Sequence, residues 1–144
     1  MREALCNEAV EVVLDYLRSM EARDLGAARK HLEDGAVIEF PGSVRMASLE
    51  DVVAWAVKRY RNLTKTLEGC DAMLRKHEVV VYCHGRLDGC WLDGAEFHDV
   101  RFIDRFEVRS ARIVSQQVWN DLETIRTRAL GGEAEPLPVQ FETQ

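Results

Sequence analysis

The first half of the chain has the hydrophobic spacing of helices. Apolar residues recur at steps of three and four from Leu5 to Met20, which places them on one buried face of a helix. Asp24 is positioned to cap a short second helix, which Gly35 would end. The segment from Ala36 to Phe40 then predicts a brief strand, which a Pro-Gly pair stops.

A third helix and a run of strands follow. Ser48 and Asp51 form the start signal of the helix, and its apolar stripe extends from Leu49 to Leu63. Alternating or β-branched patterns after it predict four strands, at Thr64 to Arg75, Glu78 to Leu87, Phe97 to Val108 and Ile113 to Trp119. Asp121 is then placed to cap a last helix, from Leu122 to Leu130.

This order of elements indicates an α+β fold in one domain, residues 1–130. Three N-terminal helices on a curved antiparallel sheet would leave a cone-shaped cavity between the layers, lined by their apolar faces. A Gly-Gly pair opens a C-terminal extended tail, residues 131–144. Its apolar residues alternate as those of an added edge strand would, at Leu137, Val139 and Phe141.

Composition narrows the class of protein and its partners. The 144 residues are 47% hydrophobic and 31% charged, which is typical of a globular domain. The net charge is −6 and the basic residues are dispersed, so we expect no nucleic-acid partner. No apolar run is long enough to span a membrane. Acidic residues interrupt the first apolar segment, unlike a secretory signal, so a cytoplasmic location is predicted.

The cysteines and histidines show no metal-binding pattern. There are four of each, and they form neither a C-x-x-C pair nor an H-E-x-x-H motif. We therefore expect no metal and no cofactor. The cysteines are interpreted as small, reduced core residues, at positions Cys6, Cys70, Cys83 and Cys90.

Two segments carry a resemblance to a known superfamily. They are DYLRSMEARDLGAARKHLEDGAVIEFPG, residues 15–42, and RFIDRFEVRSARIVSQQVWNDLE, residues 101–123. With the order of elements, they resemble the nuclear-transport-factor-2-like superfamily, in its SnoaL-like, ketosteroid-isomerase-like and limonene-epoxide-hydrolase-like branches. The resemblance implies a bent sheet wrapped around helices in a cystatin-like arrangement, a pocket at the wide end, and homodimers. It leaves the function open, because the scaffold hosts isomerases, hydratases, cyclases, epoxide hydrolases and non-catalytic binders.

The resemblance to ketosteroid isomerases fails at the catalytic positions. Those enzymes combine a carboxylate base with an oxyanion hole made of a tyrosine and a protonated aspartate. Tyr16 matches the tyrosine and Trp119 matches a pocket tryptophan, but the base falls at Phe40 and the acid at Phe102. A phenyl ring neither accepts nor donates a proton, so steroid isomerase chemistry is not expected. Tyr16 is either a core residue or a hydrogen-bond donor to the ligand.

The resemblance to epoxide hydrolases lies elsewhere in the chain. Arg86 and Asp88 have the spacing of an Arg-x-Asp pair that orients a water molecule. An ungapped alignment turns both outward, as an exposed ion pair, whereas a one-residue bulge turns them inward. Asp121 is the candidate second acid, with helix capping as its alternative role. Counting along the strand places that acid nearer Val118.

Asp104 is the strongest candidate for a catalytic acid or base. It lies between Phe102 and Phe106 on the expected cavity face, where burial would perturb its ionisation. The alternatives are pairing with an arginine such as Arg45, or a bulge that turns it outward. A polar cluster around it is predicted to include His98, Gln117 and Trp119.

These residues predict a pocket for a flat, small hydrophobic molecule. Gln117 and a set of aromatic residues would contact the ligand, namely Phe40, Trp55, Tyr60, Phe102, Phe106 and Trp119. The expected activity is metal-free acid–base chemistry, as isomerisation, hydration, cyclisation or epoxide opening. Asp104 would carry it with Tyr16, His98 or the Arg86–Asp88 pair. The alternative is a non-catalytic ligand-binding or dimeric interaction module of the same fold.

Overall fold

The computed structural model describes residues 1–131. Four helices and six strands follow one another along the chain: α1 (Arg2–Glu21), α2 (Leu25–Arg29), β1 (Leu32–Phe40), β2 (Val44–Met46), α3 (Leu49–Val57), β3 (Tyr60–Arg75), β4 (Glu78–Trp91), β5 (Glu96–Arg109), β6 (Arg112–Asn120) and α4 (Leu122–Ala129). The predicted tail strand at Leu137, Val139 and Phe141 lies outside the described residues. The α+β class is confirmed.

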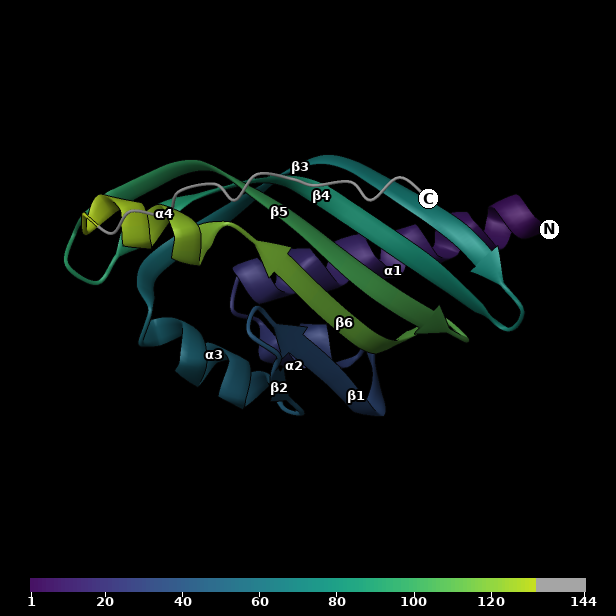
Figure 1. The fold of residues 1–144 in the computed structure, drawn as a ribbon. Helices are drawn as coiled ribbons and strands as arrows, with labels where there is room; N and C mark the ends of the chain where they lie inside the picture. Colours follow the sequence, from purple (N-terminus) through teal and green to yellow (C-terminus); the bar gives the residue numbers. More distant parts are fainter. Residues whose placement is uncertain (132–144) are drawn as a thin grey trace, which may run out of the picture.

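The strands form one curved, unclosed sheet in the order β2-β1-β6-β5-β4-β3. Neighbouring strands run antiparallel, except that β1 and β6 are parallel. The long α1 lies along one face of the strands, while α2 and α3 lie beside β1 and β2 (Figure 1). The helices therefore cover one face of the sheet and leave the other face uncovered by any element of residues 1–131.

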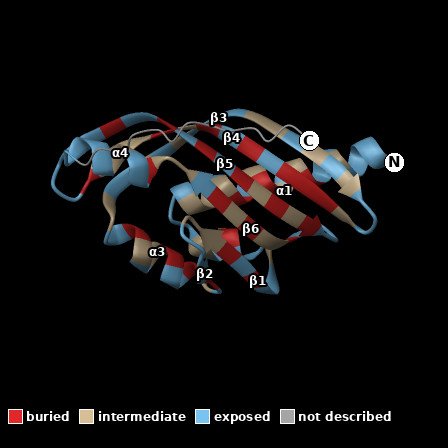
Figure 2. Ribbon diagram, in the orientation of Figure 1, coloured by how far each residue is buried: buried red, intermediate tan, exposed pale blue. Residues whose placement is uncertain are grey.

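The covered face holds two hydrophobic clusters. One packs α1 against the middle of the sheet, around Val13, Phe106 and Ile113. The other lies under α4, around Trp91 and Phe102. Buried and exposed residues alternate along β4, β5 and β6 (Figure 2), because successive side chains of a strand point to opposite faces.

The helix start signals act as the sequence predicts, but two boundaries differ. Asp24 Oδ1 accepts a hydrogen bond from the backbone of Ala27, at 3.1 Å. Ser48 Oγ accepts one from Asp51, also at 3.1 Å. The third helix was expected to reach Leu63, but it ends at Val57 and the strand β3 begins at Tyr60. The second helix ends six residues before Gly35, which lies within β1 at φ +81°.

Bulges in the long strands decide which side chains face the helices. In β6 the pairing with β5 passes from Ser115 to Ile113, so one extra residue lies between them. In β5 the pairing with β4 passes from Phe97 to Val100, with two residues opposite one. A third shift lies in β3, between Leu67 and Gly69. Each extra residue reverses the inward and outward alternation beyond it.

The β3 bulge generates a stability prediction at Gly85, whose backbone passes close to the opposing strand. A Cβ at this position would lie 1.9 Å from the carbonyl oxygen of Thr66, which is backbone and cannot rotate away. We expect Gly85→Ala to lower the free energy of unfolding by about 3 kcal/mol in urea titrations. The control is Gly26→Ala in α2, where the nearest atom is 3.7 Å away and the free energy should change by less than about 1 kcal/mol. Equal stabilities of the two variants would contradict the close approach.

Candidate functional site

A cavity of about 350 Å³ lies between the helices and the sheet. Its wall is mainly apolar and comes from the helices α1, α3 and α4 and from the strands β1, β3, β4, β5 and β6. The polar groups of the wall include two contacting pairs, Lys65 with Asp104 and Tyr16 with Gln116. Charged side chains such as Arg18, Glu21 and Arg59 also line the cavity. An apolar pocket with a few convergent polar groups is the usual form of a small-molecule site.

Lys65 and Asp104 form a salt bridge in this wall. The Nζ atom of Lys65 lies 2.5 Å from Oδ2 of Asp104. Asp104 is fully buried and the Lys65 side chain is 23% exposed, so lysine separates the carboxylate from solvent. The same Nζ lies 4.9 Å from the ring centroid of Phe102. The ammonium supplies the opposite charge that a carboxylate needs in an apolar interior.

The second oxygen of this carboxylate has no partner. Asp104 Oδ1 is buried and accepts no hydrogen bond from any side chain or backbone group of residues 1–131. Buried polar atoms are nearly always hydrogen-bonded, and an orphaned acceptor costs roughly 1–3 kcal/mol. This oxygen could therefore accept a hydrogen bond from a ligand only after the side chains that cover it have moved.

Tyr16 and Gln116 form the second polar contact of the wall. The Tyr16 hydroxyl donates to Oε1 of Gln116 at 3.0 Å, and both side chains are buried. Burial raises the pKa of Tyr16 well above its usual range, and the nearby charge of Asp104 raises it further. Tyr16 therefore remains a protonated hydrogen-bond donor, while Gln116 keeps its amide NH₂ group to offer to a ligand.

Aromatic side chains form the apolar part of the wall. Phe40 and Trp55 stack with ring centroids 4.6 Å apart, and the Arg59 guanidinium lies 4.4 Å from the Trp55 ring. Tyr60 also lines the cavity, and burial raises its pKa. Four of the predicted ligand contacts therefore line the cavity, namely Phe40, Trp55, Tyr60 and Phe102. Phe106 does not line the cavity but belongs to the core beside Tyr16, with ring centroids 6.1 Å apart.

Three predicted members of the Asp104 cluster lie on the opposite face of the sheet. The bulge in β6 turns Gln117 and Trp119 outward and brings Gln116 and Val118 into the cavity. The Trp119 side chain is 48% exposed. The bulge in β5 likewise turns His98 outward, so the prediction that His98 shares a face with Asp104 is wrong. The expected alternation failed because it assumed unbroken strands.

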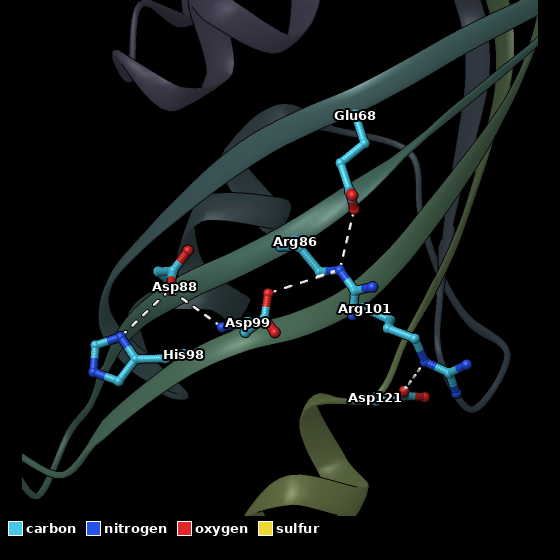
Figure 3. Close-up of polar contacts among 7 residues, drawn as sticks. All are labelled: Glu68, Arg86, Asp88, His98, Asp99, Arg101 and Asp121. Carbon is cyan, nitrogen blue, oxygen red and sulfur yellow. Dashed lines mark hydrogen bonds and ion pairs between the residues drawn. The ribbon is translucent and has the colours of Figure 1, made fainter.

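The predicted Arg86–Asp88 pair also faces outward and its members do not contact each other (Figure 3). Arg86 Nε lies 3.1 Å from Glu68 and 3.8 Å from Asp99. Asp88 Oδ1 instead contacts Nδ1 of His98, at 3.3 Å. Leu87 is the residue of this segment that lines the cavity. The exposed alternative is therefore correct for the face, but the partners are different.

Asp121 also lies away from the polar groups of the cavity. Its Oδ2 accepts a hydrogen bond from Arg101 Nε at 2.8 Å on the outer side (Figure 3). It occupies the N-cap position of α4, but its side chain makes no capping hydrogen bond. Asn120 Oδ1 accepts from the backbone of Leu122 instead, at 3.1 Å. Since the inward position of the strand end is Val118, residues 1–131 do not form the epoxide hydrolase arrangement.

Comparisons with solved structures identify the architecture. A protein of unknown function from Burkholderia pseudomallei, described as NTF2-like, is 14% identical with a TM-score of 0.65, over 83% of this chain and 95% of its own. A putative SnoaL-like polyketide cyclase from Jannaschia sp. is 18% identical with a TM-score of 0.66, over 85% and 92%. The chain has the nuclear-transport-factor-2-like fold. No family model matches this NTF2-like chain, and no curated protein matches it in sequence.

A second cyclase-like structure covers the NTF2-like chain to a similar extent. IdmH, a putative polyketide cyclase from Streptomyces antibioticus, is 18% identical with a TM-score of 0.63, over 85% of this chain and 98% of its own. At such identities the likeness is one of fold. What the cavity can do therefore depends on the residues of this chain.

Lys65 and Gln116 are the site residues that sequence reasoning missed. Lys65 pairs directly with Leu87 across the β3–β4 ladder, and directly opposed residues share a face. Once Leu87 is known to face inward, the position of Lys65 follows. Gln116 carries no comparable signal, because a bulge that no residue type marks decides its orientation.

Two further structural findings bear on the candidate chemistry. Across residues 1–131, no group of three or more His, Cys, Asp or Glu side chains is placed to hold a metal ion. Within the same residues, no helix is both long enough and apolar enough to cross a membrane. The expected absence of a cofactor and the cytoplasmic location stay predictions.

The outward position of His98 generates a pH prediction. A hydrogen bond to Glu96 and a weaker contribution from one to Asp88 raise the pKa of His98 above the ordinary 6.5. Folding therefore favours the protonated ring, and this small stabilisation is lost as the pH rises through the raised pKa. We expect Asp88→Asn to lower the pKa of His98 in an NMR titration, while Asp71→Asn on β3 leaves it in place. An unchanged titration in Asp88→Asn would contradict the outward cluster.

Proposed function

We propose that the cavity carries out acid–base chemistry on a small hydrophobic molecule, with Asp104 and Lys65 as the reacting pair. One observation carries the proposal. A fully buried carboxylate lines an apolar cavity, held on one oxygen by an ammonium and unpartnered on the other. Electrostatic interactions are strongest where water is excluded, so such a pair is well placed to move a proton.

The chemistry that fits this pair is proton abstraction beside a carbonyl group. The ligand's carbonyl oxygen would accept a hydrogen bond from Lys65 Nζ, and the flexible lysine stem would turn toward it and uncover Asp104. The carboxylate would then take the proton from the neighbouring carbon, while the electron pair moves to the oxygen as an enolate. Lys65 would hold that negative charge, and Tyr16, which remains protonated, lies in the same wall.

An enolate leads to two of the expected reaction types. Return of the proton to another carbon gives isomerisation, and attack on a second carbonyl gives ring closure. Two solved structures with this fold are described as putative polyketide cyclases, which supports carbonyl chemistry. The steroid isomerase route has no support, because Phe40 and Phe102 occupy the positions of its base and acid. Epoxide opening has no support either, because Arg86 and Asp88 face outward and do not contact each other.

Non-catalytic binding is the second candidate function, and a specific observation favours it. Asp104 is fully buried, so a ligand reaches it only if Lys65 moves. If Lys65 stays in place, the cavity offers a ligand aromatic rings and charged side chains such as Lys65 and Arg59, but no accessible base at Asp104. Such a site would retain a flat apolar molecule through Phe40, Trp55 and Phe102 without converting it.

The experiment that separates these functions is turnover of a panel of small enones and diketones. We expect Asp104→Asn to lower kcat/KM at least about 100-fold, the usual range for loss of a general base. The matched control is Asp71→Asn, an exposed aspartate of β3, which should react like the wild type. Equal rates for wild type and Asp104→Asn would remove Asp104 from the mechanism. Binding of an apolar fluorescent probe without turnover of any compound in the panel would favour non-catalytic ligand binding.

We further propose that the uncovered face of the sheet pairs two copies of the chain. Ile103 and Trp119 are directly opposed on β5 and β6, and their side chains are 38% and 48% exposed. The charges around them are already paired within the chain, as between Arg105 and Glu107 at 2.7 Å. A second copy would therefore bury the apolar residues without stranding a charge.

This dimer generates a prediction for light scattering. Trp119→Glu introduces a charge at the centre of the proposed interface, so the mass in solution should fall from two chains to one. The cavity should keep its activity, because Trp119 faces away from it. Leu92→Glu is the control, since Leu92 is equally apolar and 45% exposed but lies between β4 and β5. A wild type that is monomeric at the same concentration would contradict the proposal.

A further inference from the structure

Cys70 and Cys83 face each other across two neighbouring strands. They are directly paired in the β3–β4 ladder, and their Sγ atoms lie 2.8 Å apart. Both thiols are free. Directly opposed residues of an antiparallel pair have Cα atoms roughly 4.5–5.5 Å apart, which is within the range that a disulfide requires. The backbone is therefore already in place for a covalent link.

We propose that Cys70 and Cys83 are an oxidation site that forms an intramolecular disulfide with peroxides. The proposal does not depend on the proposed function of the cavity. From the sequence alone, both residues are interpreted as small, reduced core cysteines. Their pairing in the ladder is what gives them a shared chemistry.

The surroundings assign different roles to the two thiols. Cys83 is fully buried within the main hydrophobic cluster, and burial raises the pKa of its thiol. Cys70 is only half-buried and packs on the margin of that cluster. A peroxide from solvent therefore meets Cys70 first. Cys83 is protected from solvent but lies within reach of whatever forms on Cys70.

The reaction balances with the peroxide as the only co-reactant. The Cys70 thiol releases its proton, and the thiolate attacks one peroxide oxygen. The O–O bond breaks, a sulfenic acid forms, and the hydroxide that leaves takes up the released proton to become water. The Cys83 sulfur then attacks the Cys70 sulfur, the S–S bond forms, and the hydroxyl leaves as water with the thiol proton. The pair loses two electrons and two protons, and the peroxide is reduced to two water molecules.

The link would join an edge strand to the sheet beside the reacting pair. β3 is the last strand of the sheet and is hydrogen-bonded only to β4. It carries Lys65, and Cys83 lies directly opposite Asp104 in the β4–β5 ladder. A covalent bond between Cys70 and Cys83 would therefore hold the lysine strand against the strand beside Asp104.

The test is the intact mass of the full chain after treatment with excess hydrogen peroxide. We expect the mass to fall by about 2 Da, two of the four thiols to become inert to alkylation, and a thiol reductant to restore them. Cys70→Ser should abolish the fall. Cys90→Ser is the matched control and should retain it, because the Cys90 thiol contacts the Trp91 carbonyl elsewhere on β4.

Three results would overturn the proposal. They are four thiols still open to alkylation, a sulfinic acid accumulating on Cys70 in place of the loss of two protons, and a disulfide peptide that joins other cysteines. Hydrogen exchange tests the structural consequence separately. Amides of β3 around Cys70 should exchange more slowly in the oxidised chain, and unchanged exchange would show that the link does not fasten the edge strand.

Discussion

A charged carboxylate in an apolar wall is costly unless an opposite charge or hydrogen bonds compensate it, and in this cavity the Lys65 ammonium supplies the opposite charge to Asp104. Lys65 reaches Asp104 from a strand two positions away in the sheet, so β3, β4 and β5 must all keep their register. The glycine of β4 that lets β3 approach closely, Gly85, lies on the strand between them. The ion pair therefore depends on the geometry of these three strands.

The bulges in β5 and β6 also determine the cavity, because they decide which side chains of these strands line it. An unbroken β6 would have turned Gln117 and Trp119 inward, and an unbroken β5 would have added His98. Instead the cavity receives Gln116 and Val118 from β6. The polar residues displaced outward are satisfied by one another, as His98 is by Asp88 and Glu96. The two bulges thus leave the Asp104–Lys65 ion pair on the cavity face and place His98, Gln117 and Trp119 on the outer face.

The same bulges explain how far the sequence could be interpreted. Helix periodicity, the Asp24 and Ser48 caps and the α+β order were correctly predicted, because each depends on a few neighbouring residues. Asp104 was placed on the cavity face because the strand between it and its flanking phenylalanines is regular. Gln117, Trp119 and His98 were placed on the wrong face, because the inward and outward alternation of side chains was assumed to continue through a bulge. Lys65 was missed because the ion pair that marks it as a site residue is formed with Asp104, which lies 39 positions away along the chain.

The two phenylalanines that remove steroid isomerase chemistry also shape what remains. Phe40 and Phe102, which the resemblance aligns with the acids of steroid isomerases, line the cavity with aromatic rings. Phe102 lies against the Lys65 ammonium, where its ring face contributes a favourable interaction without accepting a proton. Lower polarity around the pair strengthens its interaction with any charge that develops on a bound molecule. Phe40 and Phe102 thus contribute apolar surface to the cavity, in which the Lys65 and Asp104 charges lie close together.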